Sequence, residues 1–254
     1  WDELVSILDT KTDVDLKKWS EVWVNQSGRP VISEELIYAE NGSIQSFNLT
    51  QLAEDGSAKI WPQTFKIGLV YPDSTQVITA AFVDQKLQLK QTEGLPKPQQ
   101  IIYNYDGMGY GVFPLQEEDL LKITSLNDEV ARGYSYINTH ENQLNARLDP
   151  VAVFDLYKNG LIAEKNALIL NRISSQTQNL FWTYFTKIQR ETHQQELEDL
   201  VYNQLQKDLP ANSKKTLFGL FKSVAYSESG KERLYAIWNQ ETEIINLKFN
   251  KDDY

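Results

Sequence analysis

The chain has 254 residues, of which 41% are hydrophobic and 11% aromatic, a composition that supplies a sizeable core and excludes a disordered chain. Its formal net charge is −10, with acidic side chains in both halves, which argues against binding to nucleic-acid phosphates or anionic membranes. The absence of cysteine excludes disulfides, thiolate metal sites and cysteine nucleophiles. No apolar run reaches the roughly 18 residues that a membrane-spanning helix needs.

The amino-terminal segment, residues 1–27, has helical periodicity. Leu4, Ile7 and Leu8 share one face, and Asp15 is placed to cap a second helix that ends before Gly28. The segment begins with Trp1 rather than methionine and lacks the pattern of a signal peptide. We therefore expect the chain to be a fragment of a longer protein.

Residues 28–114 change to the period of two that is typical of strands. Phe65, Ile67 and Leu69 alternate with other residues, and turn pairs such as Asn41-Gly42 separate the runs. Short strands with frequent turns predict a small antiparallel β-sandwich of the Ig-like kind. The predicted strands are residues 31–38, 43–52, 63–71, 76–83, 86–90, 101–105 and 110–113.

Residues 115–254 return to helical periodicity. Asp128 and Ser229 are predicted N-caps, and Asp149 is a cap followed by proline. Short loops predict antiparallel helix neighbours, so we expect an all-α, HEAT-like or superhelical domain and an α+β multidomain protein. The predicted helices are residues 116–125, 128–148, 150–164, 166–182, 187–208, 211–226 and 229–240.

The stretch "THENQL" contains the start of the zinc-peptidase motif H-E-x-x-H. His140 and Glu141 match, but Leu144 replaces the second histidine, and zinc binding needs both histidines on one helix face. We interpret this segment as a packing helix with Leu144 in the core and with Glu141 contacting an arginine such as Arg132 or Arg172. The apolar stripe would comprise Val130, Tyr134, Ile137, Leu144 and Leu148.

Two further patterns suggest chemistry only weakly. His193 stands three residues before Glu196 and could contact it, on a helix that we expect to be solvated. The chain has only two histidines, 53 positions apart, so the sequence gives little support for a Ser-His-Asp triad or a two-histidine metal site. The glycines of "DGMGYGVF" (106–113) fail the dinucleotide pattern at Val112 and predict a tight turn or close packing instead.

Paired acids and tryptophans complete the candidates. Glycosidase chemistry needs two carboxylates that face one another, and no acidic pair here is marked as such, so a hydrolase of that kind is a weak alternative. The tryptophans are expected in the core, although Trp61 could serve as a platform for a sugar or peptide. No catalytic, cofactor-binding or metal-binding residue is assigned. The acidic groups are Glu34-Glu35, Glu54-Asp55, Glu117-Glu118-Asp119 and Asp252-Asp253.

Four segments of the chain, taken in order, carry a resemblance to a known protein family. "DLKKWSEVWVNQSGRPVI" (15–32) has a D-L-x-x-W-x-x-x-W helix end and a Gly-x-Pro step into a strand, and "KIWPQTFKIGLVY" (59–71) has a strand after Trp-Pro. "NYDGMGYGVFPL" (104–115) leads out of the strands, and "DEVARGYSYINTHENQL" (128–144) starts the long helices. Together they resemble the C-terminal part of bacterial members of the aminopeptidase N-like family of zinc metallopeptidases, although Gly111 replaces a common arginine.

The resemblance implies a modular parent with a β domain, a thermolysin-like catalytic domain, a small sandwich and a helical domain. The family binds zinc through H-E-x-x-H and a glutamate about 18 residues further on. In this chain Leu144 and Ala163 occupy two of those positions, with Glu164 one residue off. The resemblance therefore implies that the metal site lies upstream of Trp1 and that residues 1–27 are the helical tail of the missing catalytic domain.

The leading hypothesis is thus a non-catalytic C-terminal region of a zinc-dependent aminopeptidase that removes N-terminal residues from peptides. This region would shape the substrate cavity, bind no cofactor itself, and have as partners the catalytic domain of the same polypeptide and the peptide substrates. The compartment stays open between the cytoplasm and the bacterial cell envelope. The alternative is a stand-alone scaffold or binding module for protein or glycan.

Overall fold

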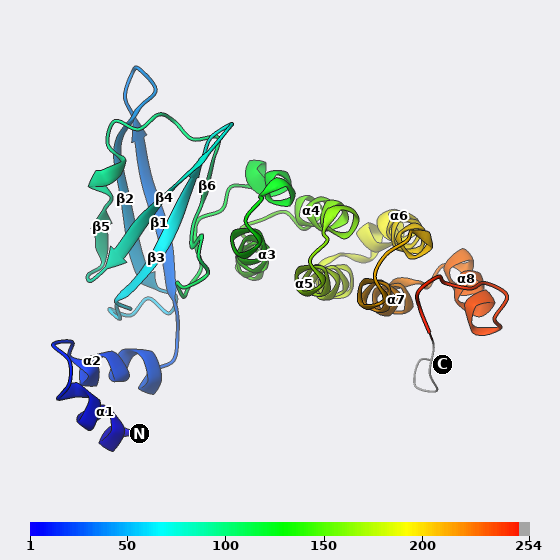
Figure 1. Cartoon of the computed structure of the whole chain (residues 1–254), viewed down its shortest axis with the longest axis horizontal. Coiled ribbons are helices and arrows are strands. Elements are labelled where there is room, and N and C mark those ends of the chain that lie inside the picture. Colours follow the sequence, from blue (N-terminus) through cyan, green and yellow to red (C-terminus); the bar gives the residue numbers. More distant parts are fainter. Residues whose placement is uncertain (249–254) are drawn as a thin grey trace. The chain divides into compact units, whose positions relative to one another are not determined.

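The computed structural model describes residues 1–248 and divides the chain into two compact units, residues 1–116 and 117–254 (Figure 1). Every strand found within the described residues lies in the first unit, whereas the second unit is helical. The fold is therefore α+β, with two small three-stranded antiparallel sheets and a long series of helices.

The first unit begins with short helical segments. Asp15 accepts a hydrogen bond from the Lys18 amide at 2.9 Å, which confirms the predicted cap. The apolar face of the first helix is not buried, since Leu4, Ile7 and Leu8 are 47–57% exposed. The segments are α1 (Asp2–Asp9), α2 (Leu16–Ser20) and the π-helix η1 (Glu21–Asn25).

Two antiparallel sheets follow, with strand orders β1-β2-β5 and β4-β3-β6. Six of the seven predicted runs are strands, but the prediction for residues 110–113 is wrong. In that run Val112 forms a single parallel bridge with Val31, through backbone hydrogen bonds with Pro30 and Ile32, and no ladder. The strands are β1 (Pro30–Tyr38), β2 (Ile44–Ala53), β3 (Gln63–Val70), β4 (Thr75–Phe82), β5 (Lys86–Gln88) and β6 (Gln100–Ile102).

Aromatic side chains fill the core of this unit. Phe65 of β3 is buried and meets Phe113 edge to face, with ring centroids 4.9 Å apart. Phe47 of β2 meets Tyr103, the residue after β6, at 6.3 Å, so side chains attached to both sheets share one core. Such aromatic pairs contribute about 0.5–1.5 kcal/mol each beyond the area they bury.

The second unit is a series of helices in which each packs on chain neighbours. Asp128 caps α3 through the Ala131 amide, and Asp149 precedes a proline at the start of α4, as predicted. The predicted cap at Ser229 is wrong, because Ser227 caps α8. The elements are the 3-10 helix η3 (Glu117–Ser125), α3 (Glu129–Leu144), α4 (Pro150–Ala163), α5 (Ala167–Asn179), the π-helix η4 (Leu180–Tyr184), α6 (Lys187–Gln206), α7 (Ala211–Val224) and α8 (Glu228–Trp238).

Helix α3 buries the opposite face from the one that its apolar residues predicted. Val130 and Leu144 are 56% and 46% exposed, so the placement of Leu144 in the core was wrong. The buried face carries polar side chains such as Ser135 and Thr139, whose hydroxyls donate to the carbonyls four residues earlier at 2.8 Å. Because these hydroxyls are satisfied within their own helix, their burial costs little.

Among the described residues of this unit, two side chains of the charged types, those of Glu198 and Lys214, are completely buried. The Glu198 carboxylate on α6 accepts bonds from the Tyr226 and Ser227 amides at 2.9 Å and from the Ser227 hydroxyl, and so anchors the start of α8. The Lys214 ammonium on α7 donates to the Leu205 carbonyl, and burial lowers the pKa of Lys214. Both charges are thus held by specific polar partners.

Close packing among α3, α4 and α5 depends on a glycine. A Cβ atom at Gly160 of α4 would lie 2.6 Å from the Tyr136 hydroxyl oxygen and 2.9 Å from a methyl carbon of Ile173. Both of these side chains are fully buried, so neither has room to move.

We predict that Gly160→Ala lowers the free energy of unfolding by about 1–3 kcal/mol because it overpacks this contact. The matched control is Gly219→Ala on α7, where a Cβ atom would have no neighbour within 4 Å. That variant should gain about 0.5–1 kcal/mol from helix propensity. Urea unfolding followed by circular dichroism measures both, and equal effects of the two substitutions would contradict the packing role of Gly160.

Candidate functional site

The broken zinc motif does not form a metal centre. His140 is half-buried, its Nδ1 atom has no hydrogen-bond partner within residues 1–248, and burial lowers the pKa of His140. Glu141 is also half-buried, while Leu144 is exposed. Among the described residues no group of three or more His, Asp or Glu side chains is placed to hold a metal ion.

The second histidine contacts its predicted partner. His193 Nδ1 lies 3.3 Å from a Glu196 carboxylate oxygen, which confirms that contact. Glu196 is exposed, as expected for a solvated helix face, but the His193 imidazole is half-buried, because it packs on the rings of Phe154 and Phe185, with centroids 5.2 and 5.5 Å away. Lys158 also pairs with Glu196, so this carboxylate joins two helices.

The glycine-rich segment is a tight turn, as predicted. Gly107 and Gly111 have φ angles of 68° and 132°, a backbone region that favours glycine. The Asn104 amide accepts from the Gly109 N–H at 2.6 Å and donates to the Gly109 carbonyl at 2.8 Å, which closes the loop on itself. These backbone groups are therefore used within the turn.

The acidic pairs serve structural contacts. In each acidic group within residues 1–248, at least one carboxylate contacts a nearby hydrogen-bond donor or cation. The pair Asp252-Asp253 lies outside the described residues. Trp61 is 1% exposed, which rules out a surface platform. The expectation of a core position is wrong for four other tryptophans, which are 38–57% exposed: Trp1, Trp19, Trp182 and Trp238. The contacts are Glu34 with the Tyr103 hydroxyl, Glu35 with Asn48, Glu54 with Arg29, Asp55 with Lys59, Glu117 with the Asp149 amide and Asp119 with Lys122.

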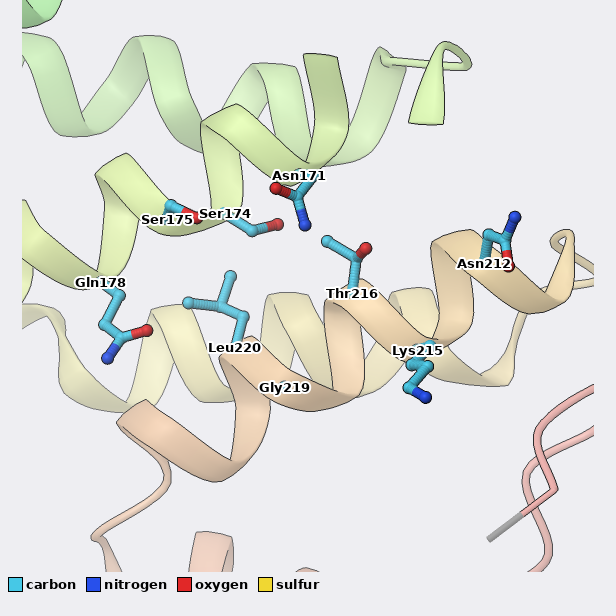
Figure 2. A pocket seen from close by; sticks show the side chains of 9 residues that line it. All are labelled: Asn171, Ser174, Ser175, Gln178, Asn212, Lys215, Thr216, Gly219 and Leu220. Carbon is cyan, nitrogen blue, oxygen red and sulfur yellow. The ribbon is translucent and has the colours of Figure 1, made fainter. Parts of the chain in front are cut away.

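A hollow lies between α5 and α7 and is the candidate site (Figure 2); most of its lining residues have polar side chains, but their apolar atoms contribute at least as much of its surface. Its volume is about 520 Å³, and each helix contributes a single face two turns long. Figure 2 shows the side chains of Asn171 and Thr216 extending into the space between the helices. The lining residues are Asn171, Ser174, Ser175 and Gln178 on α5, and Asn212, Lys215, Thr216, Gly219 and Leu220 on α7.

The hydrogen-bonding capacity of this groove is unused. Ser174 is 5% exposed, and its hydroxyl has no partner within the described residues, although Thr177 in the same helix bonds the Ile173 carbonyl at 2.8 Å. Within residues 1–248 the side chains of Asn171 and Gln178 likewise make no hydrogen bond. The Asn171 and Gln178 amides are at exposed positions and face solvent, whereas the Ser174 hydroxyl oxygen is covered by the protein itself.

Sequence reasoning did not single out this groove. The α5 lining residues are spaced i, i+3, i+4 and i+7, and the α7 residues from Asn212 to Gly219 repeat that spacing, which places each set on one helix face. A polar helix face resembles an ordinary solvated one in the sequence. The signal that could have marked it is Gly219, a glycine inside a helix without a packing reason.

No known protein family and no curated protein sequence matches this chain. Within the described residues, the helices are all too short or too polar to cross a membrane. What the groove can do is thus argued from its own chemistry. Its lining residues carry side-chain amides, hydroxyls and one amine, that of Lys215.

A second hollow, of about 380 Å³, has a buried ion pair in its wall. Arg132 Nε and Nη2 donate to the two carboxylate oxygens of Glu164 at 2.8 and 3.0 Å, and Arg132 Nη1 donates to the Leu126 carbonyl at 2.6 Å. One Glu164 oxygen also accepts from the Lys165 and Asn166 amides. The position one residue from a family zinc ligand is thus a structural carboxylate that engages Arg132.

Burial raises the pKa of Glu164, but the hydrogen bonds from Arg132 and Asn166 outweigh it and hold this pKa below its ordinary value of 4.5. A lowered folded-state pKa gives stability that is present above pH 4.5 and is lost as the pH falls through the folded pKa. We predict that Glu164→Gln costs about 3 kcal/mol at pH 7 and flattens the decline of stability in acid.

Chemical unfolding of both proteins between pH 7 and pH 3 measures this difference, a range that brackets the ordinary carboxyl pKa. The control is Glu191→Gln, which removes an exposed pair with Lys187 and should change stability by less than about 0.5 kcal/mol. Parallel pH profiles for Glu164→Gln and the unaltered chain would overturn the role given to this carboxylate.

Proposed function

We propose that this chain is the non-catalytic C-terminal region of a zinc-dependent aminopeptidase, most similar to bacterial members, in which it shapes the cavity that admits peptide substrates. The finer fold belongs to the same proposal: the two sheets form an Ig-like sandwich, and the helices form a HEAT-like superhelix. Zinc and the catalytic residues would belong to a domain that precedes Trp1.

The proposal is carried by the position of the family-like segments at element boundaries. The D-L-x-x-W-x-x-x-W pattern forms α2 and η1, and the Gly-x-Pro step follows with Gly28 at a φ of 112° and Pro30 as the first residue of β1. Trp61-Pro62 directly precedes β3. These are the steps that the family order requires at those places.

The later segments also lie at element boundaries, with one departure from the family pattern at Gly111. The Asn104–Gly111 turn connects β6 with the helical unit, and a Cβ atom at Gly111 would lie 2.5 Å from the Pro30 carbonyl oxygen. An arginine at this position, which the family commonly has, would not fit this backbone. The "DEVARGYSY" segment opens α3 directly after the Asp128 cap.

Exposed apolar surface on the first helix supports a covalent partner. Leu4, Ile7 and Leu8 are about half exposed, and Trp1 beside them is 57% exposed. A face of this kind is stable in a larger protein when another domain covers it. In the proposed parent that cover is the catalytic domain of the same polypeptide.

The second candidate function is a stand-alone binding module for protein or glycan. The observation that favours it is the α5–α7 groove, whose polar side chains have no hydrogen-bond partner within residues 1–248 and whose use does not require a catalytic domain. Both candidates assign binding rather than chemistry to the chain itself.

We predict that the product of the complete gene containing this sequence hydrolyses an amino-acyl p-nitroanilide, and that 1,10-phenanthroline abolishes this turnover because it removes the zinc. Residues 1–254 alone, shown to be folded by circular dichroism, should give no turnover. A complete gene product without an H-E-x-x-H motif and without hydrolysis would reject the aminopeptidase proposal and leave the binding module.

A further inference from the structure

We propose that Asn41 is a site of spontaneous covalent modification, in which the Gly42 backbone nitrogen attacks the side-chain amide and the asparagine becomes aspartate or isoaspartate. The chain contains two Asn-Gly pairs, at residues 41–42 and 159–160, and the fold decides which of them reacts. The inference goes beyond the proposed function, because the reaction takes place within one turn of the chain and needs neither a catalytic domain nor a binding partner.

The chemistry uses only the two residues and water. The Gly42 nitrogen, which no Cβ atom of its own residue shields, loses its proton to a base in the solvent and forms a bond to Asn41 Cγ. The bond between Cγ and Nδ2 then breaks, and Nδ2 leaves as ammonia after taking up a proton. Water adds to either carbonyl carbon of the resulting succinimide ring, which opens to aspartate or isoaspartate. The net change is the uptake of water and the release of ammonia, without any oxidant or reductant.

The first Asn-Gly pair lies at the tip of the hairpin between β1 and β2, at the top of Figure 1. Asn41 and Gly42 are both exposed, and a Cβ atom at Gly42 would meet no described atom within 4 Å. Within residues 1–248 the Gly42 N–H makes one hydrogen bond, to the Ala39 carbonyl at 2.9 Å. Freeing the attacking nitrogen therefore breaks a single hydrogen bond in an exposed turn with open space around it.

Ser43 holds the reacting carbonyl group of Asn41. The Ser43 backbone N–H and the Ser43 hydroxyl donate to Asn41 Oδ1 at 3.0 and 2.7 Å. Because Gly42 stands between these residues, the two bonds keep the side-chain carbonyl folded back along the Gly42 peptide unit. Attack at Cγ places negative charge on Oδ1, and donors already directed at that oxygen stabilise this charge. The contacts therefore favour the step that closes the ring.

The second Asn-Gly pair lies inside α4 and is protected. Gly160 is buried, and a Cβ atom there would lie 2.6 Å from the Tyr136 hydroxyl oxygen, so this backbone has no room to move. Asn159 Nδ2 donates to the Asp155 carbonyl at 2.9 Å. Freeing the Gly160 nitrogen requires local opening of the helix and of its packing, which costs far more free energy than one hydrogen bond in a turn. The same dipeptide should thus react in one place and not in the other.

The two products differ in their effect on the hairpin. Aspartate at position 41 keeps an oxygen that can accept both bonds from Ser43. In isoaspartate the main chain runs through the former side-chain carbon and is longer by one carbon atom. That extension lies at the tip where Tyr38 pairs with Ile44. The isoaspartate product therefore disturbs the pairing of β1 with β2 more than the aspartate product does.

The test is incubation of the folded 1–254 chain at mildly alkaline pH, followed by peptide mapping with mass spectrometry. Replacement of NH₂ by OH raises the mass of the affected peptide, and fragmentation places the change on one residue. We expect Asn41 to react more than about a hundredfold faster than Asn159, a ratio that corresponds to about 2.7 kcal/mol of additional opening free energy in α4. Methylation by a protein isoaspartate methyltransferase measures the share of isoaspartate.

The unfolded chain and three variants serve as controls. In urea both pairs lose their surroundings, and their rates should agree within about threefold. Asn41→Gln should remove the modified species, whereas Asn159→Gln, at the exposed matched position in α4, should leave its rate of formation unchanged. Ser43→Ala keeps the backbone donor but loses the hydroxyl donor, and should slow the reaction by about threefold to tenfold. Circular dichroism confirms that each variant is folded.

Two outcomes would overturn the proposal. The first is the absence of a mass gain at Asn41 in the folded chain over a time in which the urea-unfolded chain reacts there. The second is an equal rate at Asn41 and Asn159 in the folded chain, which would mean that the turn confers no reactivity. An unchanged rate in Ser43→Ala would overturn the role given to the Ser43 hydroxyl. None of these measurements involves turnover, so failure here is distinguishable from failure of the aminopeptidase assay.

Discussion

The helical unit is built under the constraint that a buried polar group needs a hydrogen-bond partner. Glu198 meets it by accepting the amides that begin α8, and Lys214 meets it by donating to a single carbonyl. Arg132 and Glu164 satisfy one another with bidentate geometry. These charged groups connect segments that are far apart in the sequence. The packing of the helices therefore depends on polar contacts as well as on the burial of apolar side chains.

The same constraint explains why α3 can bury its polar face. The Ser135 and Thr139 hydroxyls donate hydrogen bonds to carbonyls of their own helix, so burying these side chains costs little free energy. The hydroxyls of Tyr136 and Tyr157 have no partner in the described part of the chain, but their rings pack 6.4 Å apart and fill the space between helices. Ser174 likewise has a hydroxyl without a partner among the described residues, and its oxygen is covered, although the residue lies beside the groove between α5 and α7.

The α5–α7 groove combines side-chain amides, hydroxyls and one helix glycine. If the chain belongs to an aminopeptidase, the groove lies in the region that limits access to the catalytic domain. If it is a stand-alone module, the groove is its binding face.

The sequence by itself determined the elements and their class. Strand alternation around Phe65, the caps at Asp15, Asp128 and Asp149, and the turn at residues 106–113 are all local features, and local sterics and hydrogen bonding suffice to predict them. Only the tertiary structure decided which helix faces are buried, as the exposed Leu144, the buried Glu198 and the unpartnered Ser174 show. Burial depends on neighbouring helices distant in sequence, and one helix's periodicity does not record which of its faces those neighbours cover.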